Sequence, residues 1–147
     1  MFRGKRLADG EWVEGVPMHD TPNDRHLIIV DCWGHHEIDP ATIDRCTGQY
    51  NRNGWLIYEN DICRLNKNDK DLARVCFGEF SVYDLETEEK IDNVVGWFLK
   101  SIETDALSRR APFCYDFPLT AYYIDQLQLD VIGNNHDNPG LLQEVKA

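Results

Sequence analysis

The first hundred residues alternate between short hydrophobic runs and polar turn signals, with no long helical period. Residues 11–16 alternate polar and apolar side chains after the turn pair Asp9-Gly10, and residues 26–30 form a compact apolar run. A period of two is typical of a strand with one buried face, whereas a short continuous run is typical of a strand buried on both faces. We therefore predict one strand in each segment.

Residues 49–66 predict a hairpin. Asn53 and Gly54 tolerate positive φ at low cost, so we expect a tight turn at residues 51–54. The incoming strand ends at Tyr50 and the outgoing strand begins at Trp55.

A corner is predicted directly after this hairpin. Three polar residues, Glu59, Asn60 and Asp61, interrupt the apolar pattern before it resumes at Ile62. One short interruption suits a bend or bulge that turns a sheet towards a barrel. Gly133 and Asn134 are further turn candidates near the end of the chain.

The rest of the chain continues the strand pattern and ends in helical turns. Strands are predicted at residues 94–99 and 130–133, and on both sides of Gly78 as two short strands or one kinked strand. Polar composition predicts loops at residues 66–71 and 84–92, and a short helix or a polar insertion at residues 101–110. A helical turn is predicted within residues 122–129, and Asn138-Pro139 opens a short C-terminal helical turn.

These elements predict a mainly β fold, a β-rich α+β chain whose short strands form one or two small SH3-like barrels. A chain of 147 residues is long enough to bury a real hydrophobic core. We predict a single domain over residues 1–147, or two subdomains of about residues 1–45 and about residues 46–147.

The charge balance argues against a nucleic-acid-binding protein. The chain carries 26 acidic and 15 basic residues, a formal net charge of -11, which repels phosphate. Two small basic groups could oppose this field, and we interpret both as solvated surface charge: Arg3, Lys5 and Arg6, and the pair Arg109-Arg110.

The sequence also indicates where the protein works. No apolar run is long enough for a membrane span, and the basic N-terminus is not followed by the apolar segment of a secretory signal. The five cysteines are odd in number and scattered, as expected of reduced thiols. We expect a cytoplasmic protein that makes no membrane contact.

Glu59 and Asp61 are the first candidates for chemistry. On a regular strand, residues two apart share a face, so the two carboxylates could act as an acid/base pair or bind a metal. Acids at turns more often satisfy backbone amides, and no His or Ser in the same stretch completes a constellation. We predict that the two acids hold a corner and that the chain has no catalytic residues.

Cys32, His35 and His36 are the most metal-like cluster. Zinc sites use two pairs of ligands at short spacing, and this segment supplies one pair. We therefore predict no metal and no cofactor. The aromatic residues could stack bases, but we expect the four most prominent ones to fill a core: Trp12, Trp55, Tyr58 and Tyr83.

Three short blocks, in order along the chain, resemble the YopX proteins of bacteriophages and prophages. The first is residues 2–6 and 10–15, the second runs through Thr47-Gly48, Asn53-Gly54 and residues 57–62, and the third is residues 131–134 and 138–142. Asn60 stands where this family usually has Gly, which Asn can replace at positive φ, and Gly140 stands where an acid is common. The resemblance implies a β-rich, phage-associated protein that self-assembles, with no established activity and no catalytic residues to carry over.

Three functions remain open at this point. The first is a non-enzymatic phage accessory protein that forms a homo-oligomer and works through contacts with itself or with a host or phage protein, with direct nucleic-acid binding disfavoured. The second is an acidic mimic of nucleic acid that blocks a DNA-binding protein. The third is a hydrolase or metal-binding enzyme built on Glu59 and Asp61, or on Cys32, His35 and His36.

Overall fold

The computed structural model describes residues 1–19, 27–84, 86–104, 109–110 and 114–142. The chain divides into two compact units, Met1–Cys46 (unit 1) and Thr47–Ala147 (unit 2). The mainly β fold predicted from the sequence is confirmed, with small antiparallel sheets and one short α-helix. Closure of these sheets into barrels stays a prediction.

Unit 1 contains two small antiparallel arrangements of strands. The first strand, β1, pairs with β2 on one side and with the first residues of β6 on the other, and β4 lies between β3 and β5. The elements are β1 (Phe2–Lys5), β2 (Trp12–Gly15), β3 (Pro17–His19), β4 (Leu27–Asp31), β5 (Gly34–Glu37), the 3-10 helix η1 (Pro40–Thr42) and β6 (Asp44–Tyr50), which continues into unit 2. The strands predicted within residues 11–16 and 26–30 are therefore present, apart from His26, which lies outside the described residues.

Close packing in unit 1 explains a glycine in the first sequence block. A Cβ on Gly4 would lie 2.4 Å from a methyl carbon of the buried Ile38, so β1 can approach only with glycine at this position. One residue earlier, the guanidinium of Arg3 lies 3.0 Å from the fully buried carboxylate of Asp44 and 4.6 Å from the centre of the Trp12 ring. The basic residue at the start of the chain is thus a structural partner of a buried acid.

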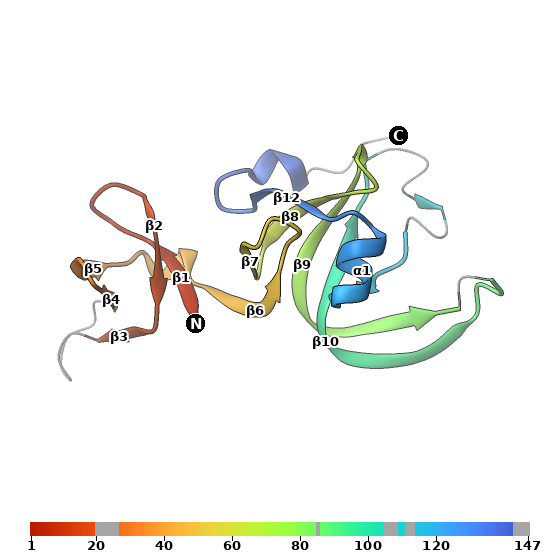
Figure 1. Cartoon of the computed structure of the whole chain (residues 1–147), viewed down its shortest axis with the longest axis horizontal. Helices are drawn as coiled ribbons and strands as arrows, with labels where there is room; N and C mark the ends of the chain where they lie inside the picture. Colours follow the sequence, from red (N-terminus) through yellow and green to blue (C-terminus); the bar gives the residue numbers. More distant parts are fainter. Residues whose placement is uncertain (20–26, 85, 105–108, 111–113, 143–147) are drawn as a thin grey trace. The chain divides into compact units, whose positions relative to one another are not determined.

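Unit 2 is built on a five-stranded antiparallel sheet in the order β11-β10-β9-β8-β12, and β7 pairs with β6. Figure 1 shows β9 and β10 running together as two long, strongly bent strands. The elements are β7 (Leu56–Tyr58), β8 (Asp61–Leu65), β9 (Asn68–Tyr83), β10 (Lys90–Ile102), β11 (Phe117–Pro118), α1 (Ala121–Gln126), β12 (Asp130–Asn134) and the 3-10 helix η3 (Pro139–Leu142).

The helix α1 covers the core of unit 2. The Thr120 side chain accepts a hydrogen bond from the N–H of Tyr123, which is a standard N-cap. The helix buries Ile124 in a cluster with Val75 of β9 and Leu99 of β10, and lies in the bend of these strands (Figure 1). A helix was expected within residues 122–129, and this expectation is confirmed, as is the C-terminal turn of η3.

Several expected boundaries differ from the structure, including the end of the loop predicted at residues 84–92, since β10 begins at Lys90. The loop predicted at residues 66–71 is only a two-residue turn, because Asn66 and Lys67 both take left-handed φ values of 55° and close a tight hairpin, so that β9 begins at Asn68. Of the two alternatives around Gly78, the single long strand is the one observed, with φ of 154° at the glycine. The insertion expected after residue 100 begins later than predicted, since β10 runs to Ile102; residues 105–108 lie outside the described residues.

Candidate functional site

Residues 59–61 form the place where the chain passes from one strand pairing to another. The preceding strand β7 pairs with β6, whereas the following strand β8 pairs with β9 and β12. Asn60 has φ of 69°, so the left-handed conformation predicted for this residue is confirmed. Glu59 and Asn60 form a turn, so Glu59 and Asp61 do not share the face of one regular strand.

Hydrogen bonds on both sides fix this corner. The Asp61 carboxylate is 2% exposed and accepts from the N–H of Tyr58 at 2.9 Å. The N–H of Asn60 donates to the carbonyl of Val75 at 2.9 Å, and the carbonyl of Asn60 accepts from the N–H of Asn135 at 3.0 Å. The Asp61 carboxylate therefore caps the backbone of the turn, as expected of an acid at a corner.

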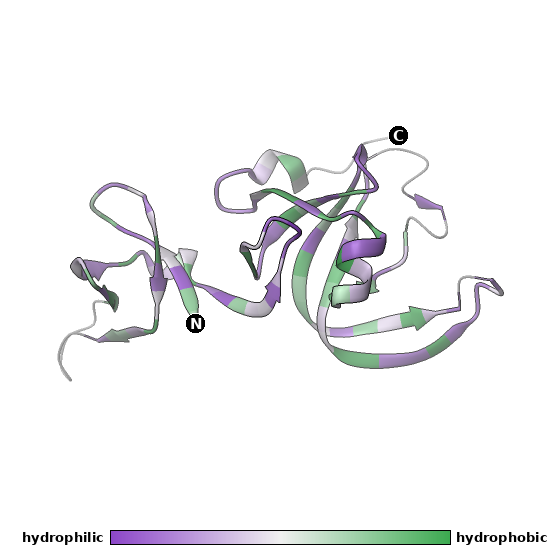
Figure 2. Cartoon of the chain, in the orientation of Figure 1, coloured by the Kyte–Doolittle hydropathy of each residue, from purple (hydrophilic) through white to green (hydrophobic). Residues whose placement is uncertain are grey.

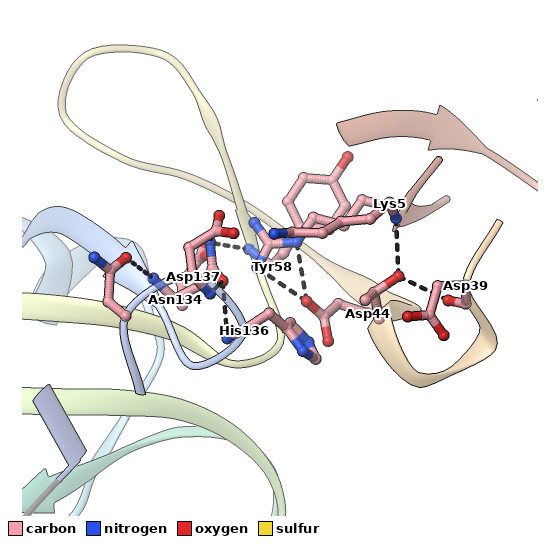
Figure 3. A network of polar contacts seen from close by, with 11 residues as sticks. Lys5, Asp39, Asp44, Tyr58, Asn134, His136 and Asp137 are labelled. Atoms are coloured by element: carbon pink, nitrogen blue, oxygen red, sulfur yellow. Dashed lines mark hydrogen bonds and ion pairs between the residues drawn. The ribbon is translucent and has the colours of Figure 1, made fainter. Parts of the chain in front are cut away.

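Asn134 organises the loop that contacts this corner. Its side-chain oxygen accepts from the N–H groups of His136 and Asp137 at 3.0 and 2.9 Å, and its amide donates to the Asp137 carboxylate at 3.0 Å (Figure 3). A Cβ on Gly133 would lie 2.3 Å from the side-chain oxygen of Asn138, so the residue before Asn134 must be glycine. The third sequence block is therefore a loop held by hydrogen bonds among its own residues, in which close packing against Asn138 explains the glycine.

The hairpin at residues 51–54 forms by the same kind of local bonding. The Asn51 side chain accepts from the N–H groups of Asn53 and Trp55, and Gly54 has φ of 83°. Trp55 lies beside the turn and is 72% exposed, so its predicted place in the core is wrong, whereas Tyr58 is buried as predicted. The outgoing strand begins one residue later than expected, which leaves Trp55 outside the paired region.

The Cys32, His35 and His36 cluster occupies the hairpin between β4 and β5. Cys32 is exposed in the turn, while His35 and His36 lie opposite Val30 and Ile29, on alternating faces of the strand. Neighbouring histidines on opposite faces cannot join one ligand set. In the described part of the chain, no group of three or more His, Cys, Asp or Glu side chains is arranged to hold a metal ion.

The Nε2 atom of His36 is bonded to the Asp31 carboxylate at 2.8 Å, and the Trp33 N–H donates to the same oxygen at 2.8 Å. Desolvation alone would raise the pKa of this carboxyl, but the hydrogen bonds from His36 and Trp33 lower it below the ordinary value. The pair thus stabilises the hairpin.

Basic side chains are matched with acids on the surface of each unit. Lys5 makes a contact of another kind: its backbone N–H donates to the Thr42 hydroxyl at 2.8 Å, and this hydroxyl donates to the backbone carbonyl of Asp39 at 2.7 Å (Figure 3). Arg6 pairs with Asp9, and Arg109 of unit 2 pairs with Glu103. The pairings of Arg6 and Arg109 agree with the interpretation of these residues as surface charge. For Arg3 that interpretation is wrong, because its side chain is largely buried against Asp44.

Unit 2 carries a two-stranded extension that we call the β9–β10 ribbon, defined as residues 77–83 of β9 and residues 90–97 of β10. These two stretches pair with each other. By contrast, β8 pairs with β9 only as far as Arg74, and β11 pairs with β10 only at Phe98 and Leu99. No described strand lies along either outer edge of the ribbon. Hydrophobic positions nevertheless continue along it (Figure 2), and four of them are exposed: Phe77, Ile91, Val94 and Val95.

A search of the described residues for a helix that is long and apolar enough to cross a membrane found none.

The model of the family described as YopX protein matches residues 2–143. The chain belongs to the YopX family. Membership in the YopX family makes this a phage-associated protein whose biochemical function is not established. A search of curated proteins found no match.

Proposed function

We propose that this YopX-family protein is a non-enzymatic accessory protein of a phage or prophage, and that it works as a homo-oligomer through protein contacts. The observation that supports the proposal is the β9–β10 ribbon, whose strand edges and apolar side chains face solvent in the single chain. An isolated two-stranded ribbon is only marginally stable in water, and soluble proteins usually protect such edges with proline or charge.

The ribbon has little of that protection along its middle. Residues 93–96 of β10 are Asn-Val-Val-Gly, without charge or proline, and Val95 is 71% exposed. A second copy of the chain suits such an edge. Two identical strands related by a two-fold axis run antiparallel, so their backbone hydrogen-bonding groups can pair. The acidic net charge of -11 disfavours nucleic acid as the occupant.

Light scattering at micromolar concentration should show more than one chain per particle. The variant Val95→Lys places a charge on the ribbon, and its register opposite Glu79 lets the new lysine pair across the strands, so the ribbon itself should survive. Val16→Lys is the matched control, since Val16 is 61% exposed but lies in unit 1.

We expect Val95→Lys to lower the particle mass and Val16→Lys to leave it unchanged. A monomer mass for the parent at every concentration would refute self-assembly. An oligomer that persists in Val95→Lys would instead refute the ribbon as its interface.

A further inference from the structure

A small cavity lies inside unit 2 between the sheet and the end of α1. Its volume is about 70 Å³, and it is partly enclosed. Its apolar walls come from β8, β9, β10, the segment of β11 and the residue after α1, namely Leu65, Ala73, Leu99, Phe117 and Leu127. A cavity bordered by so many elements of the core is held in shape by the fold rather than by one loop.

An acidic residue, Asp71, is among those that line this cavity. Asp71 lies two residues before Ala73 on β9 and is 9% exposed, so it occupies the strand face that otherwise buries apolar residues. A strand that places an acid on its core face breaks the usual pattern, and such breaks concentrate at functional sites.

Asn66 fixes the position of this carboxylate. Its side-chain amide donates to Asp71 Oδ2 at 2.9 Å, and its backbone N–H donates to the carbonyl of Leu127 at 2.6 Å. The left-handed turn at Asn66 makes both contacts possible at once. The carboxylate is therefore oriented before any ligand arrives, which reduces the entropy lost on binding.

The size and charge of the cavity define the class of ligand. A cavity of about 150 Å³ binds benzene, so one of about 70 Å³ is suited to a short branched aliphatic group rather than to an aromatic ring. The Asp71 carboxylate favours a positively charged group beside it. We propose that this cavity binds a small alkylammonium ion, with its aliphatic group against Leu65, Leu99 and Leu127 and its ammonium beside Asp71.

The test uses the full chain labelled with ¹⁵N and three ligands of similar size: isobutylammonium, isobutanol and isovalerate. Amide shifts at Leu72, Ala73 and Leu99 report on the cavity. We expect isobutylammonium to bind with a dissociation constant on the order of 1–10 mM, as suits a five-atom ligand. Isobutanol should bind about tenfold more weakly, and isovalerate should cause no shift. Nα-acetyl-lysine amide, added separately, distinguishes a lysine side chain of a partner from a free amine as the natural source of the ammonium.

Three variants identify the groups responsible. Asp71→Asn should weaken isobutylammonium binding about tenfold and leave isobutanol binding unchanged, which also shows that the variant is folded. Asp69→Asn removes the same charge from the same hairpin, but Asp69 is exposed and pairs with Arg64, so binding should be unaffected. Ala73→Val should fill the cavity and abolish binding of both ligands.

Equal affinity for isobutylammonium and isobutanol would overturn the proposal. Asp69→Asn and Asp71→Asn variants that weaken isobutylammonium binding equally would also overturn it, because the ligand would then respond only to the overall charge. The absence of shifts at the cavity with isobutylammonium at about 50 mM, roughly five to fifty times the expected dissociation constant, would overturn it directly. None of these outcomes depends on whether the protein self-assembles.

Discussion

Replacing Asn60 with valine tests whether residues 59–61 are a corner held by backbone geometry. Asn60 has φ of 69°, and a non-glycine residue in this region costs about 1–2 kcal/mol, with asparagine at the low end and β-branched residues at the high end. The backbone cannot escape the strain easily. Turning φ to a negative value would break the bonds from Asn60 N–H to Val75 and from Asn135 N–H to the Asn60 carbonyl, each worth about 1 kcal/mol.

We therefore expect Asn60→Val to lower the free energy of unfolding by about 1–2 kcal/mol. In a domain of this size, such a change corresponds to a fall in Tm of about 3–8 °C. Asn60→Gly should be neutral or slightly stabilising, because glycine takes this φ without strain. Thermal and urea unfolding followed by circular dichroism measure both variants.

Asn53→Val is the matched control, since Asn53 is an exposed turn residue outside the left-handed region. Its Tm should stay within about 2 °C of the parent, as for most surface substitutions. If Asn60→Val melts like the parent, the corner is not held by the geometry of Asn60 and the reasoning fails. If Asn60→Gly is the destabilising variant, the Asn side chain itself supports the turn.

Three further predictions concern buried groups and metal. Asp61→Ala should lower the free energy of unfolding by about 1–3 kcal/mol, because the Tyr58 N–H is left buried without its acceptor. Asp61→Asn keeps an acceptor and should lower it less. Urea unfolding compares the two variants. In the folded protein at pH 8, Cys63 should resist alkylation by iodoacetamide while the exposed Cys32 reacts. Burial first, and then the carboxylates of Asp61 and Asp130, raise the pKa of the Cys63 thiol well above its ordinary value. Mass spectrometry of the alkylated peptides measures both reactions. Dialysis against EDTA should leave Tm unchanged, and a fall in Tm that zinc restores would contradict our interpretation of the β4–β5 hairpin.

Much of the local structure could be predicted from single residues. Asn53-Gly54 marks a hairpin, Asn60 marks a left-handed corner, and Asn138-Pro139 marks the final helical turn, because each depends on the backbone preferences of the residues themselves. The order of three short blocks was likewise enough to indicate the YopX family. Such features are encoded within a few residues, so no knowledge of distant partners is needed.

Burial and pairing could not be predicted in the same way. Asp44 is buried because Arg3, 41 residues away, reaches it, and no local pattern marks this acid as different from an exposed one. Trp55 is exposed although its type predicts a core residue, because β7 begins one position later than its hydrophobicity indicates.

What the sequence by itself determined is therefore the mainly β class, the positions of the turns and the family. The tertiary structure alone decided that β9 and β10 continue as a ribbon, that Asp71 lies on the core face, and that a cavity forms beside it. The physical reason is that φ preferences act within one or two residues, whereas the burial of a side chain depends on strands that are far apart in sequence and meet only in the folded chain.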